Sequence, residues 1–561
     1  MKSQLLLLFV LFSFCFPARA ENQIRERVYV HTDKDCYVAG ETVWLKFYVI
    51  TGDFRPSSLS KVGYIEICDT EKPQMQVKIA LEKGSGAGKI KIPAEIPTGI
   101  YRLSGYTRYM RNEGEKVFFE KSIAIVNVGQ QTSDPKRFEP VERYENLPAA
   151  ANESNEPNNL TIKTDQNQYG NRKKVVLSIE NIPDNTAELV VSVAGSDSIA
   201  MVPKVNEQEW LKQVKDTFRL SREWLPEYEG HIISGNLVPK PPKEEQQLVS
   251  TLAFAGKEIR YFNGQINSQT GTADFYTAGT FGKQQIVTSV ISSTYDKVPY
   301  RLDLLSPFSE SLPDHLPVLK IYPNEKQLKE RYIGAQIQEK TDKASDNRPI
   351  QPANDSPFQP ILSYDLDEYT RFGTIGETIL EFISRVRVSK VGNSRKIRVF
   401  FEDEQRFNVG NTLVLLDGIP IYDHEDILAY NPMYIKKINV YDGRYFFGGE
   451  NPECIVSFIT RDGNLPFFQL TEGSQLFDYD CPQLPPAFEI PDYSNDEIRN
   501  SKKPDFRHTL YWNPLVELTK GRPIHLSFYT SDLCGEFKIT VEGITADGKM
   551  IRGVSYFRVS E

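Results

Sequence analysis

Long hydrophobic runs and clustered metal-binding residues are missing from most of this 561-residue chain. After residue 20, no stretch is apolar over the roughly 20 residues that a transmembrane helix needs. The six histidines show no metal-ligand spacing, and no CxxC motif occurs. The sequence therefore predicts neither a membrane-spanning helix nor a local zinc site.

Residues 1–20 hold the one long apolar run. Lys2 provides a positive start, Leu5 to Phe16 form a short apolar core, and Ala18-Arg19-Ala20 fits signal peptidase cleavage. Phe14 before Cys15 argues against a lipoprotein signal. We expect an exported protein that is periplasmic or associated with the outer membrane.

An excess of basic residues is also missing. The chain has 66 Lys and Arg against 75 Asp and Glu, and loss of Lys2 and Arg19 would leave 64 against 75, a net charge of −11. This balance argues against nucleic acid and against an anionic membrane surface as partners.

Cysteine is scarce, and five cysteines follow the signal segment: Cys36, Cys68, Cys454, Cys481 and Cys534. The odd number leaves at least one thiol without a partner in the chain. A Cys36–Cys68 bridge stays open, since sequence does not show whether their backbones approach closely enough.

The sequence lacks the common local signatures of enzymes. The stretch Gly84–Gly88 lacks the GxSxG order, no Walker-type loop occurs, and His424-Glu425 is followed by Leu428 where a zinc protease has its second histidine. We therefore expect a protein that is not an enzyme and has no catalytic residues, no cofactor and no metal.

Aromatic and alternating segments favour a mainly β, multidomain fold of immunoglobulin-like β-sandwiches with one small α+β domain. The predicted divisions are a signal peptide at 1–20, a β-sandwich at 21–128, a linker at 129–158, a β segment with a short helix at 159–228, a β-sandwich at 229–307, a helix and linker at 308–362, an α+β domain at 363–470, an irregular linker at 471–503 and a C-terminal β segment at 504–561.

Two of these divisions carry finer expectations. The short helix should present a loose stripe of Trp210, Val214, Thr217, Phe218 and Leu220. The C-terminal segment is small for a lone domain and should pack against an earlier sandwich.

The first sandwich contains a pattern of turn and aromatic residues, namely Asp33, Lys34, Tyr37, Gly40, Glu41, Pro97, Gly99, Tyr101 and Tyr106. This pattern resembles the MG2-type domain of the α-2-macroglobulin family, and the resemblance implies macroglobulin-like β-sandwiches. Residues 506–533 resemble a later macroglobulin segment, and 230–306 resemble either a carboxypeptidase regulatory-like sandwich or a further macroglobulin domain. The thioester that such proteins can carry is not expected, because Cys534-Gly535-Glu536 is followed by Phe537, which cannot supply the acyl group.

The 363–470 segment predicts a helix that begins with a capping box at Thr374 and Glu377, and a hairpin turn at Asp417-Gly418. The order of helix, strands and glycine-rich turn resembles the plug domain of TonB-dependent receptors. No barrel pattern accompanies it. The candidate interaction loops contain Asp417, Gly418, Gly443, Tyr445 and Gly448.

The combined order of modules resembles large exported proteins of Bacteroidetes-type bacteria. We expect a non-enzymatic binding or scaffold protein of a Gram-negative envelope, with a protein partner and a plug-like domain that could dock on an outer-membrane complex. The alternative is a macroglobulin-like protease inhibitor without a thioester, with its bait loop at 129–158 or 341–360.

Overall fold

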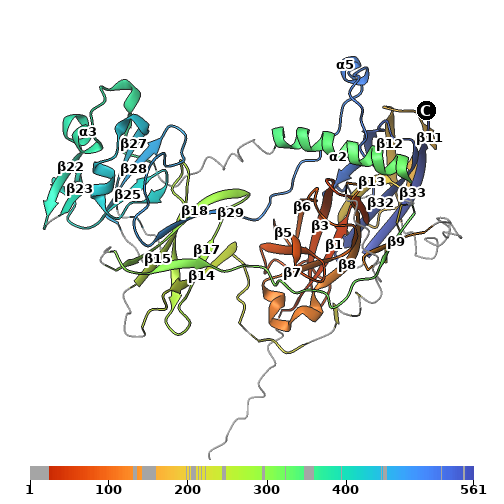
Figure 1. Cartoon of the computed structure of the whole chain (residues 1–561), viewed down its shortest axis with the longest axis horizontal. Coiled ribbons are helices and arrows are strands. Elements are labelled where there is room, and N and C mark those ends of the chain that lie inside the picture. The colour runs from red at the N-terminus through yellow and green to blue at the C-terminus, as the bar shows by residue number, and fades with distance from the viewer. Residues whose placement is uncertain are drawn as a thin grey trace, which may run out of the picture.

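The fold is mainly β, as the sequence predicts, and its strands gather in several sheets (Figure 1). The computed structural model describes residues 24–129, 136–141, 160–196, 199–200, 202–203, 210, 212, 214–215, 218–221, 223–242, 248–293, 297–322, 324–345, 359–392, 394–443, 445, 452–519, 521–547 and 550–561. The predicted signal peptide at 1–20 lies outside these residues. Among the described helices, none combines the length and apolar character needed to cross a membrane.

Sandwich I is built from residues 24–128. One sheet contains β1 (Glu26–Thr32), β3 (Thr42–Thr51) and β6 (Ser85–Lys91). The other contains β2 (Cys36–Val38), β8 (Phe119–Val126), β7 (Gly99–Thr107), β4 (Val62–Cys68) and β5 (Pro73–Ala80), and the short helices η1 (Tyr109–Glu113) and η2 (Glu115–Val117) lie between β7 and β8. Phe47, Tyr64, Tyr101 and Tyr106 are fully buried between the sheets.

The residues of the MG2-like pattern have structural roles in sandwich I. The Asp33 carboxylate accepts hydrogen bonds from the Tyr37 hydroxyl at 2.8 Å and from the Trp44 N–H at 3.0 Å. Glu41 accepts from the Val38 N–H at 3.1 Å, across a turn that Gly40 makes at a φ of 89°. These contacts fix the β2–β3 connection.

Sandwich II joins two segments that are far apart in the sequence. One sheet contains β10 (Thr161–Thr164), β12 (Lys174–Glu180) and β31 (Ile524–Tyr529). The other contains β11 (Gln168–Tyr169), β33 (Met550–Val559), β32 (Gly535–Thr545), β13 (Thr186–Gly195) and β30 (Thr509–Asn513). The C-terminal segment thus packs against an earlier β segment, as expected from its small size.

A seven-stranded unit follows in the lobe on the left of Figure 1. Its strands, in sheet order, are β19 (Arg301–Leu304), β14 (His231–Val238), β17 (Thr272–Thr277), β16 (Tyr261–Asn267), β15 (Leu248–Phe254), β18 (Lys283–Ser292) and β29 (Ser474–Asp480). β29 lies within 471–503, which the sequence analysis describes as irregular. That description is wrong for this strand, because Phe477 and Tyr479 pack on the sheet core. The same stretch also contains the short helix α5 (Asp496–Arg499).

The α+β unit spans 360–470. Its main sheet contains β21 (Leu362–Asp365), β27 (Ile435–Asp442), β28 (Cys454–Thr460), β25 (Thr412–Leu416) and β26 (Ile419–Pro420). The remaining elements are β22 (Val386–Val391), β23 (Ser394–Phe401), β24 (Arg406–Phe407), α3 (Ile375–Phe382), α4 (His424–Leu428), η4 (Leu366–Glu368) and η5 (Pro432–Tyr434). The predicted capping box at Thr374 and Glu377 is confirmed.

The connecting segments are partly ordered. β9 (Phe138–Pro140) pairs in parallel with β20 (Leu319–Ile321), and α2 (Glu325–Ser345) lies along the sandwiches (Figure 1). Of the short helical stripe predicted near residue 214, Trp210 and Val214 are buried against sandwich I, whereas Phe218 is exposed. Thr217 lies outside the described residues.

Sandwiches I and II meet through a largely buried interface. Lys46 Nζ lies 2.6 Å from Glu188 Oε2, and His31 Nδ1 contacts Glu542 Oε2. Trp44 and Trp512 pack together with Val190 beside these pairs. These contacts and this apolar cluster join the two sandwiches.

Candidate functional site

The turn at Asp417-Gly418 is the predicted hairpin, and its Asp417 side chain is buried inside the protein. Asp417 and Gly418 have φ values of 46° and 78°, as a type I′ turn between β25 and β26 requires. The Asp417 carboxylate is fully buried and accepts hydrogen bonds from the Thr460 N–H at 2.7 Å, the Thr460 hydroxyl at 2.6 Å and the Leu465 N–H at 2.9 Å. This side chain therefore anchors the 460–465 loop and is not offered to a partner at the surface.

Gly418 lies against the seven-stranded unit. The Gly256 N–H donates to the Asp417 carbonyl at 2.9 Å, and a Cβ at Gly418 would lie 2.9 Å from the carbonyl oxygens of Phe254 and Glu258. A shared apolar cluster surrounds this contact and contains Ala253, Tyr261, Val287, Leu413, Leu415, Ile419, Tyr441 and Ile455. The candidate interaction loop thus contacts a sheet of its own chain.

The remaining predicted loop residues do not gather into a separate site. Gly443 has a φ of 124° at the end of β27. Tyr445 is half-buried against the shared apolar cluster, and its N–H donates to the Pro452 carbonyl at 3.1 Å. Gly448 lies outside the described residues. Tyr445 is therefore related to Asp417 and Gly418 only because all three lie at the contact between the two units.

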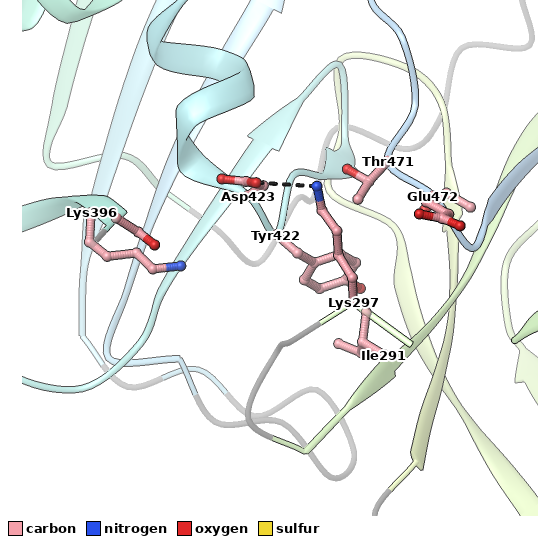
Figure 2. Close-up of a pocket in the computed structure, with 9 residues that line it drawn as sticks. Ile291, Lys297, Lys396, Tyr422, Asp423, Thr471 and Glu472 are labelled. Carbon is pink, nitrogen blue, oxygen red and sulfur yellow. Dashed lines mark ion pairs between the residues drawn. The ribbon is translucent and has the colours of Figure 1, made fainter. Parts of the chain in front are cut away.

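A hollow of about 320 Å³ opens beside this contact, between the seven-stranded unit and the α+β unit (Figure 2). Four chain segments supply its lining, which consists of Ile291, Lys297, Ser394, Lys396, Tyr422, Asp423, Thr471, Glu472 and Ser474. The wall is mainly polar, and side chains of both charges face the same space. We take this interdomain hollow as the candidate functional site.

Two lysines and two carboxylates set the electrostatics of the interdomain hollow. Lys297 Nζ lies 3.3 Å from Asp423 Oδ2, and this pair is drawn as a dashed line in Figure 2. Lys396 and Glu472 have no ion-pair partner within the described part of the chain. One positive and one negative group are thus left for a ligand.

The position of each charged side chain follows from its element. Asp423 caps α4, where its carboxylate accepts from the Glu425 N–H at 3.1 Å. Tyr422 is held from behind, because its hydroxyl lies 2.8 Å from Thr251 Oγ1 and 3.2 Å from Tyr261 Oη. Tyr422, which lines the hollow, therefore connects the α+β unit to the seven-stranded unit.

His424 follows Asp423 as the first residue of α4. It is buried, and its Nδ1 accepts from the Ile397 N–H at 2.9 Å. Burial lowers the pKa of His424 to about 4, and the nearby Lys396 charge acts in the same direction. The imidazole is therefore neutral at pH 7 and serves as a structural acceptor.

The arrangement can bind a ligand, and its groups do not form a nucleophile with an adjacent base. Within the residues that the structure describes, no group of His, Cys, Asp and Glu side chains is placed to hold a metal ion. Cys534 is exposed, and partial desolvation together with the nearby Glu561 charge raises the pKa of its thiol. Phe537 lies in the core of sandwich II. All five cysteines after the signal segment are free thiols in the structure.

A second polar cluster is structural. The Glu227 carboxylate accepts from the Tyr64 hydroxyl at 2.8 Å and the Ile232 N–H at 2.8 Å, and it lies 2.9 Å from His231 Nδ1. The other ring nitrogen of His231 is 2.7 Å from the Tyr479 hydroxyl. Burial lowers the pKa of His231 to about 4. These groups satisfy one another and connect sandwich I to the seven-stranded unit.

The residues that line the hollow are not among those predicted from the sequence. Lys297, Lys396 and Glu472 come from segments that the sequence assigns to three different regions. None of these residues belongs to a local motif, so only the packing of the two units brings them together.

Comparisons with known proteins give low similarity throughout. No protein-family model and no curated protein matches the sequence. Matching solved structures include Salmonella alpha-2-macroglobulin reacted with methylamine, with 8% identity, coverage of 96% of this chain and 39% of that chain, and a TM-score of 0.24. Native E. coli alpha-2-macroglobulin matches with 10% identity, coverage of 96% and 40%, and a TM-score of 0.25.

The chain spans about two fifths of the length of these macroglobulins. Yersinia pseudotuberculosis adhesin InvE matches with 9% identity, 49% of this chain, 58% of that chain and a TM-score of 0.14. At TM-scores this low, the likenesses carry no conclusion about activity or partner. The assignment of a mainly β fold with several sheets comes from the strands of the structure and not from these comparisons.

Proposed function

We propose that this chain is an exported, non-enzymatic binding or scaffold protein of a Gram-negative cell envelope, located in the periplasm or at the outer membrane. The signal-like segment at 1–20 and the resemblances to MG2 and plug domains support export and envelope location. The observation that carries the proposal is the joining of the plug-like α+β unit to a sheet of its own chain through a shared apolar cluster.

The described part of the α+β unit exposes several apolar side chains, and Phe467 is the most exposed of them. Phe467 is 85% exposed and Met433 is 54% exposed, and the Phe467 ring lies 5.2 Å from that of Tyr434. We call these three residues the Phe467 patch. The loop that carries Phe467 is fixed, because the buried Asp417 carboxylate holds Leu465 and the Tyr430 hydroxyl donates to the Pro466 carbonyl at 2.5 Å. Aromatic side chains are enriched at the energetically dominant positions of protein interfaces, which makes Phe467 a candidate contact residue.

The finer proposal is that the Phe467 patch contacts an outer-membrane protein. The test is a pull-down of the tagged full chain from detergent-solubilised envelopes, together with fractionation of the cells. Wild type should recover an outer-membrane protein, and Phe467→Asp should not.

Leu380→Asp is the matched control, because Leu380 is 81% exposed on α3 of the same unit. It should recover the partner as wild type does. Recovery of no outer-membrane protein by wild type, or equal loss in both variants, would contradict docking through the Phe467 patch. A cytoplasmic location in the fractionation would contradict the envelope role itself.

A further inference from the structure

We propose that the interdomain hollow binds a short zwitterionic peptide, with the peptide carboxylate at Lys396 and its ammonium group at Glu472. This inference concerns a different surface from the Phe467 patch and does not depend on an outer-membrane partner. It rests on the charges, hydroxyl groups and size of the hollow between the seven-stranded unit and the α+β unit.

The positions of the charged side chains determine the direction in which the ligand would lie. In the view of Figure 2, Lys396 and Glu472 lie on opposite sides of the Lys297–Asp423 ion pair. The central pair neutralises itself, while the outer lysine and carboxylate have no ion-pair partner among the described residues. A ligand with a negative end and a positive end would complete both, and charge-assisted hydrogen bonds are the stronger class of polar contact.

The hydroxyl groups of the hollow suit the backbone of such a ligand. Ser394, Thr471 and Ser474 line the hollow together with the charged groups. A hydroxyl can both donate and accept, so it suits the alternating N–H and C=O groups of a peptide backbone. Tyr422 closes the floor and contributes its ring as an apolar surface.

The volume limits the occupant to a small molecule. About 320 Å³ is near the lower end of the range of ligand sites. A di- or tripeptide is compatible with this space, whereas a folded partner is not. The hollow belongs to well-anchored elements, because Ser474 Oγ lies 2.7 Å from Ser289 Oγ on β18.

Two other ligand classes suit the wall less well. A phosphate would find a lining in which two carboxylates oppose two lysines. A neutral sugar could use the hydroxyl groups, but it would cover Lys396 and Glu472 without neutralising either, which costs desolvation energy. Both classes therefore serve as competing outcomes in the test.

The experiment is calorimetric titration of the full chain with triglycine, with triglycine capped at one end or at both ends, with inorganic phosphate and with a neutral disaccharide. The variants are Lys396→Met and Glu472→Gln. Lys390→Met is the matched control, because Lys390 is an exposed lysine on the neighbouring strand β22. All three changed residues lie at the surface or half-buried, and far-UV circular dichroism checks that each variant folds.

Triglycine should bind to wild type and to Lys390→Met alike. Lys396→Met and amidation of the carboxyl end should each weaken binding at least about tenfold, and together they should weaken it no further, because both remove the same contact. Glu472→Gln and acetylation of the amino end should likewise each weaken binding at least about tenfold, and together they should weaken it no further. No binding of triglycine, equal binding of the doubly capped peptide, or tighter binding of phosphate or disaccharide would overturn the proposal.

Discussion

Asp417 shows how one buried carboxylate can fix a surface loop. Its two oxygens accept three hydrogen bonds from Thr460 and Leu465. In Asp417→Asn an NH₂ group would replace one oxygen and face these donors. We expect the opening free energy of β25, β28 and the 460–465 loop to fall by about 2–4 kcal/mol.

Hydrogen exchange with mass spectrometry measures this change locally, which suits a chain of several units. Asp462→Asn is the matched control, since Asp462 is an exposed carboxylate in the same loop. Equal protection in both variants would show that the buried bonds do not hold the loop.

His424 predicts a pH dependence. Its folded-state pKa of about 4 lies below the ordinary histidine value, mainly because the ring is buried. Between about pH 6.5 and pH 4 the unfolded chain therefore binds more protons than the folded one, so stability is complete above this window and falls as the pH falls through it. The loss approaches roughly 3 kcal/mol at the low end.

His424→Gln can keep an acceptor for the Ile397 N–H without titrating in this window. Exchange protection of β23 and α4 should fall with pH in wild type and change less in the variant. An identical pH profile in both would rule out His424 as the titrating group.

At the scale of elements, α3 begins at a capping box. The Thr374 hydroxyl accepts from the Glu377 N–H at 3.2 Å, and the Glu377 carboxylate accepts from the Thr374 N–H at 3.1 Å. Thr374→Ala should lower the stability of α3 by about 1 kcal/mol. Exchange rates of the first-turn amides measure this effect. Thr370→Ala, a change at an exposed threonine outside the helix, should leave these rates as in wild type.

The β25–β26 hairpin joins the α+β unit to the seven-stranded unit through Gly418. Gly418→Ala would place a methyl group against the carbonyl oxygens of Phe254, Gly256 and Glu258, at a φ of 78°. Gly392→Ala is the matched control, because Gly392 has a φ of 60° with no described atom within 4 Å of an added Cβ. That control carries only the cost of positive φ, about 1–2 kcal/mol.

Gly418→Ala should therefore increase exchange in 253–258 as well as in the hairpin itself. Gly392→Ala should affect only the β22–β23 turn. Unchanged protection of 253–258 in Gly418→Ala would mean that the two units do not depend on this contact.

On the scale of the whole molecule, local chemistry predicted individual elements better than their partners. The Asp417-Gly418 turn and the Thr374 cap follow from a few neighbouring residues, so the sequence located both. β29 was missed because its alternating Phe477 and Tyr479 stand beside Pro-rich stretches. Its pairing with β18 and the meeting of Lys396 with Glu472 depend on distant segments, and no local pattern encodes them.

Helix α2 presents the clearest test of long-range assembly. Arg331 is fully buried and donates to Glu41 at 2.9 and 2.7 Å and to the Cys36 carbonyl at 3.0 Å, all in sandwich I. Burial alone would raise the pKa of Glu41, but the charges of Arg331 and Lys34 outweigh it and hold that pKa well below its usual range. The stabilisation is therefore present at neutral pH and is lost as the pH falls towards the folded-state pKa.

Arg331→Met should destabilise the docked α2 by about 3–5 kcal/mol, because it leaves Glu41 buried without its main partner. Lys329→Met is the matched control, since Lys329 is exposed on the same helix. Exchange protection of 325–338 should fall in Arg331→Met and persist in Lys329→Met. If α2 amides stay protected in both variants, the Arg331–Glu41 pair is not what holds the helix on sandwich I. Apolar packing would then hold it, because the Ala335 Cβ lies only 3.5 Å from the position of a Cβ added at Gly40.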